Sequence, residues 1–377
     1  MKTELHHSSA PQRGAGIQPR VGAAQRSLPW VGSQNNLCPE GAQECHACSD
    51  GSAAPSGRVQ CVGPVTQGSA ARNPGLYSGA PLGHSTSRRH FLGASFASLV
   101  ASALPFPAAE AAPRYRIAVC DWMILKRQKL GAFQLTNDIG ADGVEVDMGS
   151  LGERETFENE LAKPEVRDAF LAKARELNLG ISSLAMSGFY AQSFAERPTV
   201  PRMVQDTVDT MVAMGVKVAF LPLGVRGDLV KHPELRPAIV ARLKAAGAQA
   251  EKAGVVIGIE TALAAKDEVK LLDEIGSPGV RSYFNFANAL QNGRDLLTEL
   301  RTLGKDRICQ IHCTDEDGVW LEENKRLDLP AVKKVLDEMG WRGWLVIERS
   351  RSAKNSRDVK GNFGANTRYL KKIFQGA

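Results

Sequence analysis

A short apolar segment followed by a helical pattern repeats eight times between residues 115 and 374, at intervals of about 25 to 40 residues. The apolar segments are rich in β-branched and aromatic residues, a composition typical of strands. Strict alternation of strands and helices requires parallel strands joined by right-handed crossovers. We therefore expect strands at residues 115–120, 142–147, 180–186, 216–221, 255–260, 280–286, 307–313 and 343–349.

Two α/β architectures satisfy such a pattern, a closed barrel and an open doubly wound sheet. Eight units in about 260 residues match a (β/α)8 TIM barrel, whereas a doubly wound sheet usually has five or six strands. No G-x-G-x-x-G or G-x4-G-K-[ST] sequence follows any expected strand, which disfavours nucleotide binding. We predict a single TIM-barrel domain over residues 112–377, with helices near 164–177, 201–214, 235–253 and 329–339 and a last helix from about 366 to 374.

The first 86 residues have a different composition. They are rich in Gly, Ser, Ala, Pro and Gln and show no sustained apolar period. Such segments cannot bury enough apolar surface to offset the entropy of ordering. We expect residues 1–86 to be a disordered leader, or to follow from a start codon assigned too far upstream.

Residues 87–111 have the layout of an export signal. Ser87-Arg-Arg-His-Phe-Leu92 contains a twin arginine, residues 93–104 are apolar, and an Ala-rich stretch allows cleavage near Ala111. This predicts export by the twin-arginine translocation machinery to a periplasmic or other external location, with no stable membrane span after cleavage. The alternative is a buried or membrane-anchoring N-terminal helix.

Charge argues against a nucleic-acid partner. The chain has a net charge of +6, but residues 112–377 contain 39 basic and 36 acidic side chains. This near balance lacks the strongly basic surface that phosphate backbones require. We expect a small-molecule partner, and the sequence leaves the oligomeric state open.

Polar residues end four successive expected strands. Because side chains alternate along a strand, each lies opposite the apolar face and is expected to point into the barrel mouth, where TIM-barrel sites form. Any one of them could instead cap the next helix, but four in register favour a site. Two carboxylates, an imidazole and an amide suit a divalent Mn, Mg, Co or Zn ion. These candidate metal ligands are Glu260, Asn285, His312 and Glu348.

The segments around these residues resemble the sugar phosphate isomerase/epimerase superfamily of xylose-isomerase-like barrels. The matching segments are Ile-Gly-Ile-Glu260-Thr, Tyr-Phe-Asn285-Phe-Ala, Gln-Ile-His312-Cys-Thr and Leu-Val-Ile-Glu348-Arg, and Gly-Val-Glu145-Val resembles the family's inward glutamate. The resemblance implies that Glu260 and Glu348 bind metal and exchange the substrate proton. It also implies a metal that polarises a substrate carbonyl while the carboxylates move protons.

The sequence departs from the family pattern at several positions. Asn285 stands where the family usually has Asp, and a neutral amide binds a divalent ion more weakly than a carboxylate does. In the ketose 3-epimerase branch, Asn288 would be His, Lys266 would be Glu and Gly318 would be Arg. These differences disfavour a ketose 3-epimerase. A related three-zinc DNA-repair site is also disfavoured, because residues 112–377 contain only His232 and His312.

Five further residues are candidate substrate contacts. The carboxylates could bind sugar hydroxyls, although Asp147 could equally cap a helix, and the tryptophan could stack on a sugar ring or pack in the core. The lysine could meet an anion or be solvated. The candidates are Glu145, Asp147, Trp122, Asn288 and Lys266.

The leading function from sequence is a divalent-metal-dependent isomerase or epimerase that acts on a sugar or sugar derivative by proton transfer next to a carbonyl. Two alternatives use the same barrel. A lyase or hydratase on 3-keto sugars needs the same proton abstraction but releases water or an aglycone. A non-catalytic sugar-binding barrel is the third possibility, and Asn285 favours it.

Overall fold

The structure is a computed structural model and describes residues 114–376. The leader expected at 1–86 and the twin-arginine signal expected at 87–111 lie outside these residues. Within 114–376 the chain alternates between strands and helices along its whole length.

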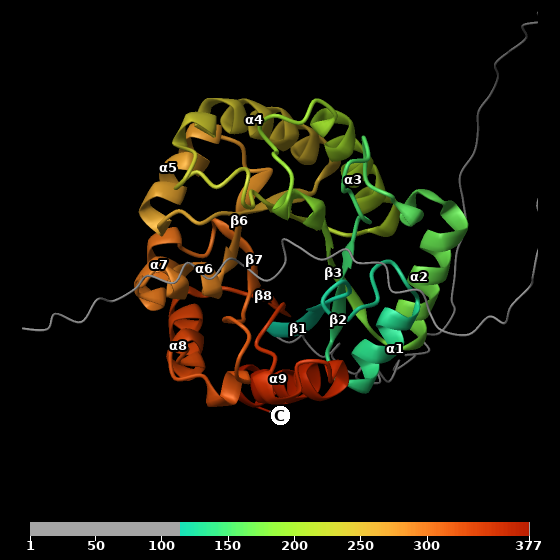
Figure 1. Cartoon of the computed structure of the whole chain (residues 1–377), viewed down its shortest axis with the longest axis vertical. Coiled ribbons are helices and arrows are strands. Elements are labelled where there is room, and N and C mark those ends of the chain that lie inside the picture. Colours follow the sequence, from blue (N-terminus) through green and yellow to red (C-terminus); the bar gives the residue numbers. More distant parts are fainter. Residues whose placement is uncertain (1–113, 377) are drawn as a thin grey trace, which may run out of the picture. The chain divides into compact units, whose positions relative to one another are not determined.

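Eight parallel strands form a closed barrel in chain order, with β1 hydrogen-bonded to both β2 and β8 (Figure 1). Closure leaves no free sheet edge, so every strand has a neighbour on each side. The strands are β1 Tyr115–Cys120, β2 Gly143–Asp147, β3 Gly180–Ala185, β4 Val218–Pro222, β5 Val256–Glu260, β6 Val280–Asn285, β7 Ile308–His312 and β8 Gly343–Ile347.

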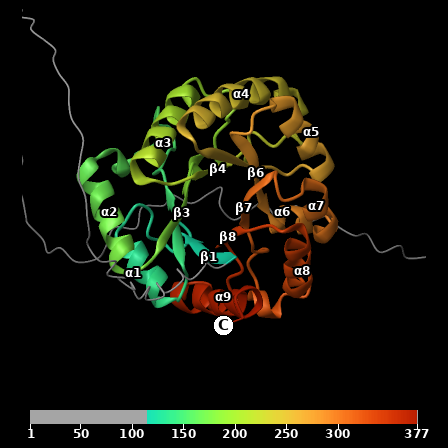
Figure 2. The same cartoon turned by 180° about the vertical axis from the view of Figure 1, so that it is seen from behind.

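Helices surround the barrel on the outside, as both views show (Figures 1 and 2). This arrangement confirms the predicted (β/α)8 TIM barrel. None of the helices in residues 114–376 combines the length and the apolar character needed to cross a membrane. The helices are α1 Gly131–Asp138, α2 Pro164–Glu176, α3 Val200–Met214, α4 Arg236–Ala253, α5 Ala265–Ile275, α6 Phe286–Gln291, α7 Leu296–Leu303, α8 Leu329–Met339 and α9 Val359–Phe374.

The last helix is longer than predicted. The sequence analysis placed its start near residue 366, but α9 begins at Val359. The side chain of Asp358 accepts a hydrogen bond from the backbone N–H of Gly361 and caps the helix. Two glycines in the first two turns, Gly361 and Gly364, weaken the helical pattern there, which explains the error.

The two faces of the strands separate as side-chain alternation predicts. Ile257 and Ile259 of β5 belong to the fully buried hydrophobic core. Gln310 of β7 instead points into the barrel, where it donates hydrogen bonds to Ser183 of β3 and Tyr283 of β6. Because of the same alternation, the side chains at the strand ends point into the barrel mouth.

Candidate active site

The four predicted metal ligands meet at the mouth of the barrel. Glu260, Asn285 and His312 are the last residues of β5, β6 and β7, and Glu348 directly follows β8. All four are buried. The Asn285 amide nitrogen Nδ2 donates to Glu260 Oε2 at 3.0 Å and to Glu348 Oε2 at 3.2 Å. The structure thus joins both carboxylates to one side chain.

Asn285 both caps the helix that follows it and takes part in the site. Its Oδ1 accepts the backbone N–H of Ala287 at 2.9 Å and caps α6. This bond fixes the orientation of the amide, because a carbonyl oxygen must face the backbone donor. Its N–H groups, rather than an oxygen lone pair, therefore face Glu260 and Glu348.

His312 lies between two carboxylates. Its Nδ1 is 3.1 Å from Glu260 Oε2 and its Nε2 is 3.1 Å from Glu145 Oε1. Burial alone would lower the pKa of His312, but contacts with Glu145, Glu260 and Glu348 outweigh burial and raise it to about 10. Both ring nitrogens face carboxylate oxygens, an arrangement that favours the protonated imidazole.

Glu145 forms the floor of the site, with no exposed surface. Its Oε2 accepts hydrogen bonds from Ser183 Oγ at 2.5 Å and from the hydroxyl of Tyr283. Sequence reasoning found Glu145 but did not assign roles to Ser183 and Tyr283. Their signal was available, because Tyr283 lies two residues before Asn285 and shares its inward face.

Glu348 is held by side chains from three different parts of the barrel. Its Oε1 accepts from the Tyr190 hydroxyl at 2.9 Å and lies 3.5 Å from Arg349 Nη2. Burial raises the pKa of Glu348, yet the positive charges of Arg349 and His312 bring it below its usual value. Glu348 is therefore held ionised, as a proton acceptor must be.

A thiol also approaches the site from β1. Cys120 Sγ lies 3.5 Å from Glu145 Oε1 and 3.8 Å from His312 Nε2. Their ligand atoms lie within 4.8 Å of one another, so these three residues could hold a metal ion. Burial is the main cause of a raised pKa for the thiol, which keeps it protonated when no metal is bound. Sequence reasoning left Cys120 out, although it ends a barrel strand.

Three of the four residues at the mouth, Glu260, His312 and Glu348, carry the oxygen and nitrogen donors that divalent ions prefer, whereas the ligand atoms that lie within 4.8 Å of one another are those of Cys120, Glu145 and His312. Bonds of about 2.1 Å at right angles place neighbouring ligand atoms about 3 Å apart, and His312 Nδ1 lies 3.1 Å from Glu260 Oε2 and 3.9 Å from Glu348 Oε2. Glu145 would orient the imidazole by accepting its Nε2 proton. Asn285 is the exception, because its oxygen is occupied by the helix cap.

Two of the predicted substrate contacts lie in the surrounding packing. Trp122 is buried and stacks on Phe220 with ring centroids 6.3 Å apart. Asp147 accepts the Gly149 N–H at 2.8 Å, and Arg127 lies 3.6 Å away. Burial raises the pKa of Asp147 to about 6. For these two side chains, loop capping and core packing account for the observed contacts.

Two more predicted substrate contacts, Asn288 and Lys266, lie on the helices that follow β6 and β5. The amide of Asn288 donates to the backbone oxygen of Thr261 at 3.1 Å and so ties α6 to the loop after β5. Lys266 is exposed in the first turn of α5. The structure does not join either side chain to Glu260 or Glu348 by a hydrogen bond in the part of the chain it describes.

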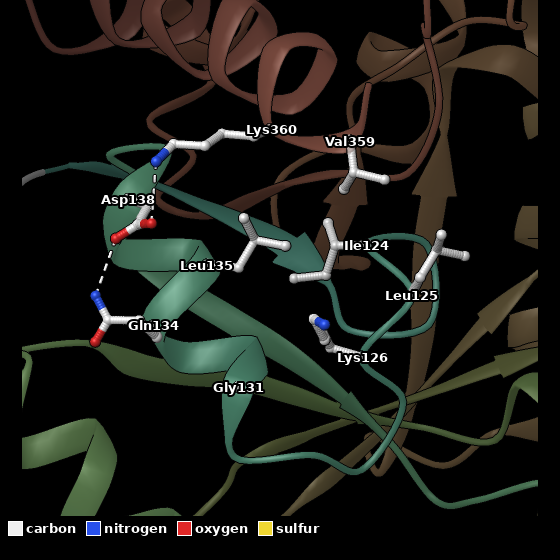
Figure 3. A pocket seen from close by; sticks show the side chains of 9 residues that line it. All are labelled: Ile124, Leu125, Lys126, Gly131, Gln134, Leu135, Asp138, Val359 and Lys360. Carbon is white, nitrogen blue, oxygen red and sulfur yellow. Dashed lines mark hydrogen bonds and ion pairs between the residues drawn. The ribbon is translucent and has the colours of Figure 1, made fainter. Parts of the chain in front are cut away.

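A separate cavity of about 500 Å³ lies between the loop after β1, helix α1 and the start of α9 (Figure 3). Ile124, Leu135 and Val359 provide apolar walls, and Lys360 pairs with Asp138 at 3.0 Å. None of the residues that line it belongs to the carboxylate cluster. We therefore place the chemistry at the barrel mouth rather than in this cavity.

Comparison with known proteins agrees with the fold. Residues 133–373 match the family model described as xylose isomerase-like TIM barrel. This match covers more than half of the chain. The chain belongs to the xylose isomerase-like TIM barrel family.

Individual relatives are more distant. The chain is 27% identical over 208 residues to a 2-epi-5-epi-valiolone 7-phosphate 2-epimerase of Actinoplanes sp., covering 53% of this chain and 72% of that protein. It resembles the solved structure of an E. coli 3-keto-D-glucoside 4-epimerase, at 15% identity and a TM-score of 0.54, over 68% of this chain and 99% of the other. A Methylomonas D-allulose 3-epimerase gives 15% identity and a TM-score of 0.52, over 70% and 98%. At 15% identity, the matches to solved structures support the fold alone.

Proposed function

We propose that this protein is a divalent-metal-dependent isomerase or epimerase that moves a proton next to the carbonyl group of a sugar or sugar derivative. The observation that carries the proposal is the meeting of Glu260 and Glu348 at one amide, Asn285 Nδ2, beside His312. Epimerisation needs one group to remove a proton and another to return it. Two carboxylates on neighbouring sides of one buried site provide that pair.

Glu348 is the proposed proton acceptor. Tyr190, Arg349 and Asn285 all hydrogen-bond its carboxylate and favour the ionised form. Glu260 has one oxygen, Oε2, engaged by Asn285 and His312. Glu260 is therefore the proposed partner that returns the proton from the other side of the reacting carbon.

Glu260, His312 and Glu348 would hold the metal of the proposal, whereas Asn285, the fourth predicted ligand, uses its side-chain oxygen in the helix cap. A bound Mn, Mg, Co or Zn ion would polarise the substrate carbonyl and stabilise the enediolate charge. Asn285 donates hydrogen bonds to both glutamates, whereas a carboxylate at this position would offer the metal a charged oxygen ligand. We expect weaker metal binding than an aspartate at this position would give.

The substrate class rests on relatives. The curated relative is named as an epimerase of a cyclitol phosphate, and the solved neighbours are named as epimerases of sugars. The protein is accordingly an isomerase-type enzyme, and the carbohydrate is the part that remains proposed. Phe220 and Tyr283 pack against the His312 ring with ring centroids 4.6 Å away and are fully buried, so they hold the imidazole in place from the side.

Export is proposed on the sequence alone. Arg88 and Arg89 precede an apolar stretch and an Ala-rich cleavage region, a layout that the twin-arginine machinery recognises. We expect a periplasmic or otherwise exported enzyme. Replacing both arginines by lysine should retain the protein in the cytoplasmic fraction, and unchanged export of that variant would contradict the proposal.

Solvent isotope exchange tests the function. Metal-loaded protein in deuterated water should introduce deuterium next to the carbonyl of a ketose substrate without changing any other atom of the product. For the epimer whose proton faces Glu348, Glu348→Gln should slow exchange by about 100- to 10,000-fold, because it removes the proposed base but keeps its shape. Loss of water or of an aglycone from a 3-keto sugar would indicate a lyase instead. If the protein bound no metal and showed no exchange with any sugar of a broad panel, the proposal that it is an enzyme would be rejected.

A further inference from the structure

Arg349 follows Glu348 on a rigid part of the loop between β8 and α9. Its backbone N–H donates to Thr314 Oγ1 at 3.0 Å. The next residue, Ser350, has a left-handed φ of 68°, and Asn366 of α9 donates to its carbonyl oxygen at 2.8 Å. A non-glycine residue keeps such a backbone conformation only where its surroundings hold it. The loop therefore presents the Arg349 side chain in a defined direction.

The guanidinium of Arg349 uses little of its hydrogen-bonding capacity. Among residues 114–376, its side-chain hydrogen bond is to Glu348 Oε1, at a long 3.5 Å. A guanidinium carries five N–H donors. Nearby arginines use theirs differently: Arg326 makes two bonds to Asp315, and Arg351 makes a bidentate pair with Asp317. Arg349 thus has donors left over, and 26% of its side chain is exposed.

The location of these spare donors matters more than their number. Arg349 lies against the proposed base, and its charge also acts on Glu260 and Tyr190. Its guanidinium is therefore at the barrel mouth and not on the outer surface. A cation with free donors beside the reacting carboxylate is a ready partner for a planar anion.

We propose that Arg349 binds an anionic group of the substrate, a carboxylate attached within one or two carbons of the reacting carbon. The inference rests on the proposed function, because it takes Glu348 as the base. A reacting carbon must lie about 3 to 3.5 Å from the carboxylate oxygen that removes its proton. Arg349 Nη2 is 3.5 Å from Glu348 Oε1, an oxygen of the proposed base. An anion paired with the guanidinium is therefore close to the reacting carbon. The substrate class that fits is a keto sugar acid.

The position of the anion can be tested with four matched probes. 2-Keto-D-gluconate carries its carboxylate directly on the carbonyl carbon, and D-fructuronate carries it at the far end of the chain. D-Fructose is the neutral reference, and D-fructose 6-phosphate places a phosphate at the far end. The measurement is the rate of deuterium incorporation next to the carbonyl, at saturating Mn²⁺, for wild-type protein and three variants.

The variants separate binding of an anion from a general effect on Glu348. Arg349→Gln removes both the positive charge and the paired N–H donors of the guanidinium. Arg349→Lys keeps the positive charge but not the paired donors. Lys354→Gln removes one exposed cation from the same loop and serves as the matched control. If Arg349 acted only as a counter-ion of Glu348, Arg349→Gln would shift the pH profile equally for every probe.

We expect wild-type protein to exchange 2-keto-D-gluconate fastest. Arg349→Gln should lower kcat/KM for this probe about 10- to 100-fold more than for D-fructose, mainly through KM. Arg349→Lys should recover only part of the loss, and Lys354→Gln should change neither rate. Equal losses for charged and neutral probes, or a preference for D-fructose, would overturn the inference and leave the proposed function standing.

A binding measurement separates the two proposals when catalysis is slow. D-Gluconate has the carboxylate but no carbonyl, and D-glucitol is its neutral counterpart. Calorimetry should detect D-gluconate binding to the wild type that is weakened at least about 10-fold in Arg349→Gln, with no difference for D-glucitol. Exchange absent for all four ketose probes, with D-gluconate binding intact, would reject the proposed function. Gluconate binding that is unaffected by Arg349→Gln would reject the anion site.

Discussion

Asn285 determines the character of the site at the scale of single residues. The side-chain oxygen of Asn285 caps α6, and its amide N–H groups bridge Glu260 and Glu348. An aspartate in the same conformation would keep the cap with one oxygen and direct the second oxygen at the two glutamates. Such an oxygen would be repelled by them unless a cation lay between. The amide therefore allows the carboxylates to converge without a metal, and an aspartate would require one.

Asn285→Asp should increase the affinity for Mn²⁺ by at least about tenfold, because affinity follows the number of charged oxygen ligands. The metal-free variant should also unfold at a lower temperature than the wild type, with the loss restored by Mn²⁺. Metal titration and thermal unfolding measure both effects. Gln291→Glu adds the same charge at the exposed end of α6 and should show neither effect. Equal Mn²⁺ affinity in all three proteins would show that Asn285 does not control metal binding.

Glu268 is a second residue whose burial has a measurable consequence. The Thr261 hydroxyl donates to its Oε2 at 2.8 Å, and the Glu268 side chain is buried. Burial is the largest cause of the rise in the pKa of Glu268 from 4.5 to about 7. Since the folded pKa is raised, the contribution of this group to stability is complete below pH 4.5 and is lost as the pH rises through 7.

The free energy of unfolding should therefore decrease by about 3 kcal/mol between pH 4.5 and 8 on account of Glu268. Glu268→Gln keeps the shape of the side chain and cannot ionise, so its stability should depend less on pH by that amount. Urea unfolding at several pH values provides the measurement. Parallel pH profiles for the two proteins would mean that Glu268 ionises in the fold without penalty.

At the scale of elements, α9 organises the loops on either side of Glu348. Asn362 accepts from Trp320 Nε1 and from the Ser352 N–H, at 2.8 and 2.9 Å. Asn366 accepts the Leu321 N–H at 2.9 Å in addition to its bond to Ser350. These two buried amides, one turn apart, connect the loops after β7 and β8 to one helix.

Asn366→Ala should lower the free energy of unfolding by about 1 to 3 kcal/mol, because it leaves a buried N–H and a buried carbonyl unpaired. It should also slow proton exchange, since the loop that positions Glu348 and Arg349 loses its restraint. Urea unfolding and the isotope-exchange rate measure the two effects. Asn355→Ala, at an exposed position of the same loop, is the control. An Asn366→Ala protein with wild-type exchange would indicate that α9 supports the fold only.

The sequence could predict elements and inward faces but not the orientation of polar groups. Alternation along β5 to β8 placed Glu260, Asn285, His312 and Glu348 at one mouth, since a strand allows only two faces. The way Asn285 turns its amide depends on the N–H of Ala287, a contact that appears only once α6 has formed. Tyr190 reaches Glu348 across 158 positions of the chain, which no local pattern encodes.

At the scale of the whole molecule, the barrel depends on the pairing of its first and last strands. β1 and β8 align from Tyr115 with Gly343 to Val119 with Ile347. The C-terminal helix also returns to β1, because Gln375 donates to the Tyr115 carbonyl at 3.0 Å. Closure thus joins the two ends of residues 114–376, so loss of β1 or β8 would open the sheet.

A chain that begins at residue 112 should therefore fold by itself, with a single cooperative unfolding transition and the catalytic rate of the full chain. A chain that begins at residue 121 lacks β1 and exposes the edges of β2 and β8, so it should aggregate or remain unfolded. Calorimetry and circular dichroism of the two fragments provide the comparison. Failure of the first fragment to fold would place the domain boundary before residue 112.

The most direct measurement of the central claim follows deuterium exchange from each of two epimers of a substrate in the metal-loaded variants Glu348→Gln and Glu260→Gln. If the two glutamates face opposite sides of the reacting carbon, each variant should still exchange the proton of one epimer, should fail to exchange that of the other, and should interconvert neither. Exchange of both epimers by either single variant, or loss of both in only one variant, would contradict a two-carboxylate proton transfer at this barrel mouth.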